Sequence, residues 1–232
     1  MSIANSFVTS TLLAVGAALA GAGSASAQDW TGGFVSIGLG QGSSTVDWTM
    51  PSGAPIFAPA GYRGAGSDSG LAANVEVGQL YGSDALLYGW AFGLTHLSHD
   101  QSMASPLFPL DTFATEMGPV ISLTGRIGRA SGRWMVYGEA GAVAARLGTP
   151  HSTPFCPSPC TLDLDTVAPG AVLGVGVDYR LNERFSLGLN YRHMRFFDTN
   201  ASGMVSGLAA PQTYELGGDA NVVTLRVTMT LD

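Results

Sequence analysis

Three side chains near the middle of the chain have the types and spacing of a hydrolytic site. His96 and Ser98 stand two residues apart, and Glu116 follows further along the chain. A serine attacks an ester or amide when a histidine takes its proton and a carboxylate orients that histidine. In extended strands His96 and Ser98 share one face, whereas Glu116 has the parity of the opposite face. A second histidine, His193, has Arg195 where the serine would stand. We therefore expect a polar rim here and no enzyme activity.

A pair of cysteines and a pair of acids follow in one segment. Cys156 and Cys160 form the sequence Cys-Pro-Ser-Pro-Cys. In an exported protein this spacing favours a local disulfide over a metal site, and no histidine stands beside it at zinc spacing. Asp163 and Asp165 could bind a cation, but solvated acidic loop residues are far commoner. No phosphate-binding loop, dinucleotide fingerprint or zinc signature occurs, so we expect no metal and no cofactor.

Six charged side chains are expected to meet inside the fold. They lie on the less apolar side of alternating runs and are Glu76, Arg126, Glu139, Asp178, Arg192 and Arg226. Unpaired charges in a confined interior are costly, so these groups should form ion pairs and hydrogen bonds. Such a network could be a gated path for ions, or a polar plug that fixes the strand register. We favour the plug.

The elements that would position these side chains are eight runs with the alternation of β-strands. They cover residues 33–47, 71–81, 85–98, 116–128, 134–146, 167–180, 185–196 and 221–232. The connections after the second, fourth and sixth runs are short, whereas 48–70, 99–115, 147–166 and 197–220 are long. An even number of strands with tight turns at one end and long loops at the other is typical of a bacterial outer-membrane β-barrel. The expected fold is all-β, an eight-stranded antiparallel up-and-down transmembrane barrel.

Composition fits an exported membrane protein. Residues 1–27 carry an apolar segment that ends Ala25-Ser26-Ala27, the small-x-small pattern of a signal-peptide cleavage site, so we expect residues 28–232 to be the barrel domain. A transmembrane anchor is the competing interpretation of the leader. Mean hydropathy is +0.24 and charged residues make up 12%, yet no later stretch has the ~20 apolar residues of a membrane helix. A secreted soluble β-sandwich or barrel remains the alternative.

The charge of the chain excludes one class of partner. The formal net charge is −7, and all ten basic residues are arginine. An acidic chain with so few basic residues argues against binding to nucleic acid.

Aromatic residues are expected to form two girdles at the membrane interfaces, where amphipathic rings are preferred. The expected interfacial residues at the tight-turn end are Phe34, Trp134, Tyr179 and Phe185; those at the long-loop end are Trp48, Tyr191 and Phe196.

At this point the chain resembles the small eight-stranded outer-membrane barrels of the OmpA/OmpX type, the opacity-like surface antigens and porin-family proteins. The resemblance rests on the leader, the Trp30–Val35 entry, the Leu187–Arg192 run and the alternating last strand. It implies a bacterial outer-membrane location with both termini in the periplasm. It also implies outer-membrane lipid, lipopolysaccharide and the outer-membrane assembly machinery as partners. Some such barrels are lipid A deacylases with a His-x-Ser pair and a nearby Glu, although the Asn expected after the serine is His99 here.

The expected role is therefore a non-enzymatic barrel that anchors in the outer membrane and presents four extracellular loops. Surface antigen, envelope integrity and adhesion are the corresponding activities, with an unidentified extracellular ligand. A narrow porin-like channel for small solutes or ions is the first alternative. A membrane-embedded lipid A hydrolase that uses His96 and Ser98 is the second.

Overall fold

Alternating side chains make almost the whole described chain β-strand. The computed structural model describes residues 30–52, 60–83, 86–98, 100–104, 111–153, 160–206 and 210–231. Within these ranges no helix is long and apolar enough to cross a membrane. The strands are β1 (Gly32–Thr49), β2 (Arg63–Ser83), β3 (Leu86–Leu97), β4 (Asp100–Ala104), β5 (Thr112–Ser131), β6 (Trp134–Thr153), β7 (Cys160–Arg180), β8 (Phe185–Val205) and β9 (Ala210–Leu231).

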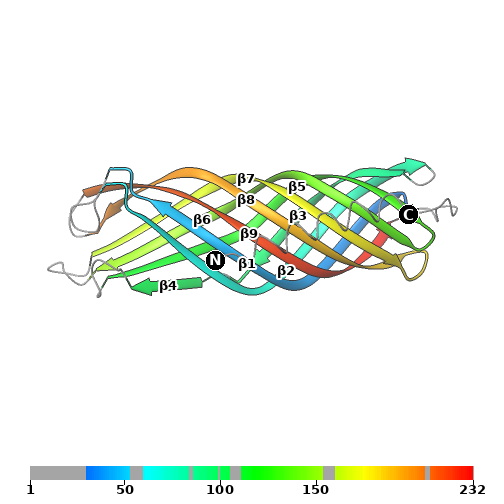
Figure 1. Ribbon diagram of the computed structural model, residues 1–232, viewed down its shortest axis with the longest axis horizontal. Coiled ribbons are helices and arrows are strands. Elements are labelled where there is room, and N and C mark those ends of the chain that lie inside the picture. The colour runs from blue at the N-terminus through cyan, green and yellow to red at the C-terminus, as the bar shows by residue number, and fades with distance from the viewer. Residues whose placement is uncertain are drawn as a thin grey trace, which may run out of the picture.

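The strands close into a ring. Strands that follow one another in the chain pair in antiparallel fashion, and β1 pairs with β9. β3 and β4 both pair with β5, one after the other, so together they fill a single position. The described strands therefore form a closed, eight-stranded antiparallel barrel, as the alternation and spacing predict. Figure 1 shows this barrel as a long tube around which the strands run obliquely.

An apolar belt surrounds the part of the barrel nearest the tight turns. Its exposed side chains include Ile37, Leu39, Val75, Val77, Trp90, Phe92, Ile121, Leu123, Leu173, Leu187, Leu189, Leu225 and Val227. On β9 the outward apolar residues run from Val223 to Leu231. A tilted strand needs about 9–11 residues to cross the hydrocarbon core, so the belt has the height of a membrane. Apolar side chains on the outer face of a barrel are stable only in lipid.

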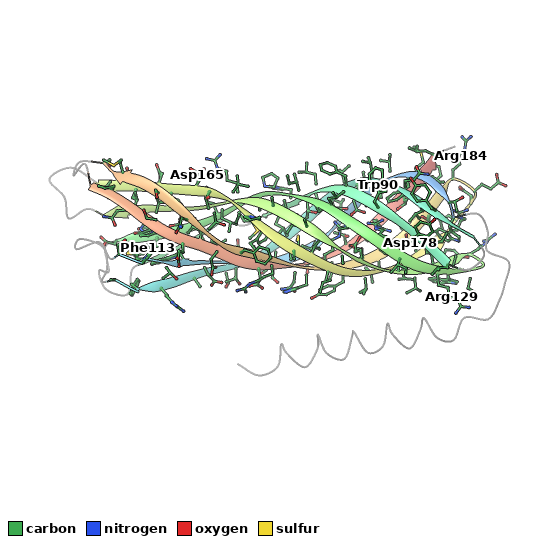
Figure 2. All side chains as sticks on the ribbon, turned by 90° about the horizontal axis from the view of Figure 1, so that it is seen from above. Trp90, Phe113, Arg129, Asp165, Asp178 and Arg184 are labelled. Carbon is green, nitrogen blue, oxygen red and sulfur yellow. The ribbon has the colours of Figure 1, made fainter. Side chains whose placement is uncertain are left out.

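Beyond the belt the two faces of the barrel exchange character. The outer surface there carries polar residues such as Thr45, Ser67, Asp165 and Arg195, while the interior is apolar. In this upper part the barrel therefore has the polar exterior and apolar core of a soluble protein. The view in Figure 2 separates the ends, with Phe113 and Asp165 toward the long-loop end and Arg129 and Arg184 toward the tight-turn end.

The strands continue beyond the belt and form an extension of the barrel. The prediction of four long loops is therefore wrong for most residues of 48–70, 99–115, 147–166 and 197–220, which lie in strands. β1 continues to Thr49, β2 begins at Arg63, β6 runs to Thr153 and β9 begins at Ala210. The upper strands do not alternate with lipid on one side, so their pattern differs from that of the membrane part. A search for lipid-facing alternation therefore misses them.

Two irregularities change which side chains face inward. The ladder shifts between Met117 and Val120 in the β5–β6 pairing and between Phe196 and Thr199 in the β8–β9 pairing. A bulge inserts an extra residue and so reverses the inward–outward parity beyond it. Met117 is consequently buried and Glu116 is exposed, opposite to the parity that the sequence suggests for both.

Candidate functional site

The six charged side chains proposed from the sequence lie together in the lumen. Six strands supply them: β2 carries Glu76, β5 Arg126, β6 Glu139, β7 Asp178, β8 Arg192 and β9 Arg226. Each is at most 5% exposed. Three carboxylates face three guanidinium groups, so the formal charges of this lumen network cancel.

Glu76 and Glu139 hold the network together. Arg126 donates from Nη2 to Glu76 Oε2 at 2.6 Å and from Nε to Glu139 Oε2 at 2.9 Å. Arg192 donates from Nε to Glu139 Oε1 at 2.7 Å and also pairs with Glu76. Two arginines therefore bridge the same two glutamates, and this arrangement fixes four strands relative to one another.

Arg226 connects the remaining acid to the same network. Its Nη2 donates to Asp178 Oδ2 at 2.6 Å and its Nε donates to Asp178 Oδ1 at 3.2 Å, a bidentate pair. Its Nη1 donates to Glu76 Oε2 at 3.1 Å. The Tyr137 ring lies 4.9 Å from the Arg226 guanidinium and 5.0 Å from that of Arg126, so one ring contacts both cations.

Small inward residues make room for these long side chains. A Cβ at Gly188 would collide with Asp178 Oδ1, and one at Gly174 would lie 2.7 Å from Glu139 Oε1. Asn190 fills a neighbouring position and donates to Glu139 Oε1 at 3.1 Å and to the Tyr137 hydroxyl at 3.0 Å. The lumen at this level is therefore filled by protein groups.

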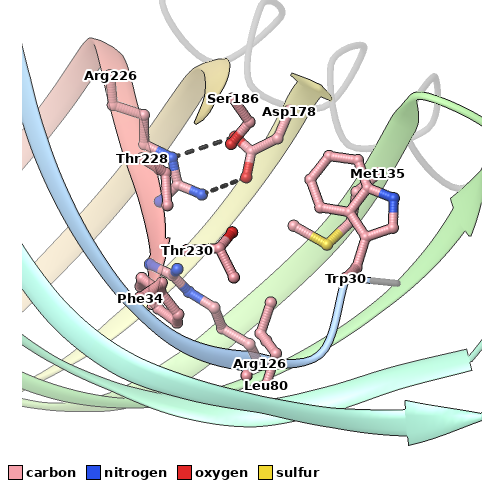
Figure 3. A pocket seen from close by; sticks show the side chains of 11 residues that line it. Trp30, Phe34, Leu80, Arg126, Met135, Asp178, Ser186, Arg226, Thr228 and Thr230 are labelled. Atoms are coloured by element: carbon pink, nitrogen blue, oxygen red, sulfur yellow. Dashed lines mark hydrogen bonds and ion pairs between the residues drawn. The ribbon is translucent and has the colours of Figure 1, made fainter. Parts of the chain in front are cut away.

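A recess lies between the lumen network and the tight-turn mouth (Figure 3). It is a partly open recess whose wall includes Trp30, Phe34 and Met135. Arg226, Asp178 and the hydroxyl-bearing Thr228 form its polar side. Trp30 also lies under the Arg180 guanidinium, 4.3 Å from ring centroid to charge. The recess ends at the lumen network.

An apolar plug fills the interior on the other side of the lumen network. We define it as the large buried cluster of the upper barrel, which includes Val46, Leu97, Met117, Val120, Leu147, Leu162, Leu164, Met194, Phe196, Leu216 and Val222. Several of these side chains have no exposed surface at all. A closely packed apolar interior of this kind excludes water and ions.

Aromatic rings form the outer layer of the plug. Trp48 stacks on Phe113 at 5.2 Å and on Tyr214 at 5.8 Å between ring centroids. His151 meets Phe113 edge-on at 4.1 Å, and its two nitrogens hydrogen-bond with the hydroxyls of Thr149 and Tyr214. This level lies beyond the apolar belt. Burial there lowers the pKa of His151 from 6.5 to about 3, so the ring is neutral.

The aromatic residues expected at the membrane interfaces lie on different faces of the barrel. Trp134, Tyr179, Phe185 and Tyr191 lie on the outer face of their strands. Phe34, Trp48 and Phe196 are 4%, 2% and 0% exposed and point into the barrel, so they are not interfacial. The parity of β1 decides the first two, because both have even numbers like the inward Ser36. Their rings pack against the arginines and the plug instead.

The possible hydrolytic residues share one surface. His96, Ser98 and Glu116 are all exposed on the outer face just above the belt. The bulge at Met117–Val120 brings Glu116 to this side and so corrects the parity argument against it. Among the hydrogen bonds and ion pairs of the described residues, however, none joins any two of the three. Within the described part of the chain, His96 therefore has no hydrogen bond to Glu116 that would orient it as a general base.

The remaining candidates concern cysteines and metals. Cys156 lies outside the described residues, so the disulfide to Cys160 stays a prediction. Asp163 and Asp165 are exposed, and Asp165 pairs with Arg146 at 2.8 Å on the outer surface. The residues that the structure describes contain no group of three metal-ligating side chains.

The plug is the feature that sequence reasoning missed. Its signal was present, because Val46, Trp48 and Met50 alternate with polar residues just as Leu162 and Leu164 do. That alternation has the opposite sense to the one in the belt, with apolar residues inward. A segment with this alternation is easily mistaken for a weakly apolar loop.

Known proteins show the same architecture. The outer membrane protease OmpT of Escherichia coli has a TM-score of 0.55 at 9% identity, with 90% of this chain and 99% of that chain covered. The outer membrane protein OprG of Pseudomonas aeruginosa has a TM-score of 0.53 at 16% identity, with 86% and 96% covered. No curated protein matches the sequence. Residues 11–228 match the family described as "Outer membrane protein beta-barrel domain". The chain therefore belongs to this family of bacterial outer-membrane β-barrels.

Proposed function

We propose that this protein is a closed, non-enzymatic barrel that anchors in the outer membrane and displays a rigid extension at the cell surface. The observation that carries the proposal is the double seal of the lumen. The lumen network occupies the membrane level, and the apolar plug occupies the level beyond it. Each seal alone would obstruct a hydrated ion.

The first alternative, a narrow channel, finds no support in the interior. An ion on its way through would have to break the pairs of Arg126 and Arg226 and then cross a layer that includes Leu147 and Leu216, both without exposed surface. Crossing an apolar layer without hydrogen-bonding partners is costly for any charged solute. The lumen network thus blocks the lumen at the membrane level and fixes the register of the strands.

We also propose an orientation, which the difference between the two ends of the barrel supports. We place the tight turns and both termini in the periplasm and the long-loop end outside, in line with barrels that have short periplasmic turns. The extension beyond the belt then stands above the outer leaflet, with a polar surface suited to contact with other cells or matrix. Lipid and lipopolysaccharide would surround the belt.

Single-channel recording in planar bilayers tests the closed barrel. Wild-type protein should give no discrete conductance steps. A Phe196→Ala/Leu216→Ala variant opens space in the plug, but it should also give no steps because the lumen network remains. Adding Arg126→Ala to that variant should produce steps. Regular ohmic steps from the wild type would favour the channel. Heat-modifiable migration on gels verifies that each variant is folded.

A lipid-modifying hydrolase is the second candidate, since His96, Ser98 and Glu116 lie on one lipid-adjacent surface. The absence of a hydrogen bond among them places it second. Mass spectrometry of lipid A from cells with wild-type or Ser98→Ala protein tests it. We expect identical acylation patterns of lipid A in the two kinds of cell. A change in lipid A acylation that is present with the wild-type protein and absent with Ser98→Ala would establish the enzyme.

A further inference from the structure

The recess at the tight-turn mouth holds a buried hydroxyl without a partner. Thr228 lines the recess and is 8% exposed, and within the described part of the chain its hydroxyl makes no hydrogen bond. Ser186 stands directly opposite Thr228 in the β8–β9 ladder and lines the same recess. A buried polar group costs free energy unless a hydrogen bond satisfies it. The recess therefore points to a ligand.

Arg126 brings a charged donor to the same recess. Its hydrogen bonds to the described residues leave from Nε, to Glu139, and from Nη2, to Glu76, so the N–H groups of Nη1 take no part in them. Figure 3 shows Arg126 and Thr228 on one side of the recess, with Trp30 across from them. Because the two glutamates hold the guanidinium in place, its remaining donors are preorganised.

The charge around the recess favours an anion. Arg180 is buried at the same mouth, with its guanidinium 4.3 Å from the centroid of the Trp30 ring. With it, the buried side chains in this half of the described barrel include four arginines and three carboxylates. The Asp178 carboxylate lies in the recess wall, but both of its oxygens accept hydrogen bonds from Arg226. An excess of positive charge attracts an anion more strongly in a buried site than in water.

From these donors and charges we infer that the recess binds a small monovalent anion of the size of chloride. The Nη1 group of Arg126 and the hydroxyls of Thr228 and Ser186 would donate to it. A guanidinium only donates hydrogen bonds and a halide only accepts them, so the two match. Much of the remaining wall is apolar, including Leu80 and Met135, and would leave the acceptors of a larger oxyanion unpaired. The anion enters and leaves by the tight-turn mouth, because the recess ends at the lumen network.

Binding can be measured on the folded full-length barrel in a non-ionic detergent. The starting buffer contains sodium gluconate, whose anion is too large for the recess, and sodium chloride or sodium bromide replaces it at constant ionic strength. The readout is the ¹H–¹⁵N resonance of the Trp30 indole, assigned with Trp30→Phe. We expect a saturable shift of this resonance with both halides. The indole of Trp134, which is exposed on the outer face, is the internal control and should show no saturable shift.

A matched pair of variants connects the shift to the recess. Thr228→Val removes the unpartnered hydroxyl and should weaken halide affinity at least about tenfold, the loss expected for a hydrogen bond to a charged group. Thr224→Val removes another buried, inward-facing hydroxyl of β9 that does not line the recess, so the affinity should stay unchanged. Heat-modifiable migration on gels verifies that both variants are folded.

Crystals of the wild-type barrel grown in sodium bromide locate the anion. We expect an anomalous peak within hydrogen-bond distance of Arg126 Nη1 and Thr228 Oγ1. The absence of a saturable shift in the wild type, full affinity in Thr228→Val, or a recess that holds only water in the bromide crystals would each overturn the inference. The titration of the wild type needs no variant, so a folding defect does not leave the question open. Bilayer conductance is a separate measurement, so this inference and the closed barrel can fail independently.

Discussion

Arg126 and Glu139 stand directly opposite one another in the β5–β6 ladder, and their side chains form an ion pair inside the barrel with Nε and Oε2 2.9 Å apart. The hairpin between them is short, so this pair is local in sequence. Each partner then reaches other strands, Arg126 to Glu76 on β2 and Glu139 to Arg192 on β8. A local pairing thus becomes the centre of a network that spans the lumen.

Removal of one charge from this centre should be strongly destabilising. Glu139→Gln leaves two buried guanidinium groups without full compensation, so we expect the unfolding free energy to fall by about 3–5 kcal/mol. Equilibrium unfolding in urea with the barrel in lipid vesicles measures the change. The control is Asp165→Asn, which breaks an ion pair whose side chains are 68% and 52% exposed and should cost at most about 1 kcal/mol. Equal effects of the two variants would argue against a tight lumen network.

Neighbouring phenylalanines provide a test of the plug. Phe196 has no exposed surface, whereas Phe197 is 54% exposed. Phe196→Ala should lower the unfolding free energy by about 3–5 kcal/mol because it removes packing and leaves a cavity. Phe197→Ala should lower the unfolding free energy far less, since more than half of the Phe197 side chain is already exposed on the outer face. The same unfolding assay compares them, and a larger effect at Phe197 would show that the plug is not the core of the upper barrel.

An arginine scan along β5 locates the membrane. Leu123 is 57% exposed within the belt, so Leu123→Arg should destabilise the barrel in lipid by about 2–4 kcal/mol. Thr112→Arg, on the outer face above the belt, should stay within about 0.5 kcal/mol. Unfolding in vesicles provides both values. A comparable cost at Thr112 would mean that lipid also surrounds the extension.

His151 should make stability depend on pH. The unfolded chain binds a proton near pH 6.5, whereas the folded ring does so only near pH 3. The contribution of His151 to the free energy of unfolding is therefore fully present above pH 6.5. It falls as the pH falls, by about 2 kcal/mol between pH 7 and pH 5. His151→Gln should flatten the profile over this interval in urea titrations. His193→Gln is the control, because it shows how the loss of an exposed histidine changes the same pH profile of the unfolding free energy. An unchanged slope in His151→Gln would contradict the assignment.

Local sequence carried most of the information about the belt. Residues such as Leu225 and Arg226 alternate with a period of two, and an extended strand places them on opposite faces whatever surrounds it. The same rule puts Glu76, Asp178 and Arg192 on the inner face, and a narrow lumen requires such charges to pair. The interior side of each network residue was therefore readable in advance.

The sequence by itself determined the strand faces within the belt, the number of strands in the ring and the charges that enter the lumen. These follow from the two-residue repeat of a strand and from where tight turns occur. Only the tertiary structure decided three further features. The bulges turned Glu116 outward and Met117 inward; the strands continued through segments that had looked like loops; and ring closure brought Trp48, Phe113, His151 and Tyr214 into one layer. Each depends on register between strands distant in sequence, which is set by the packing of the whole barrel and not by any single strand.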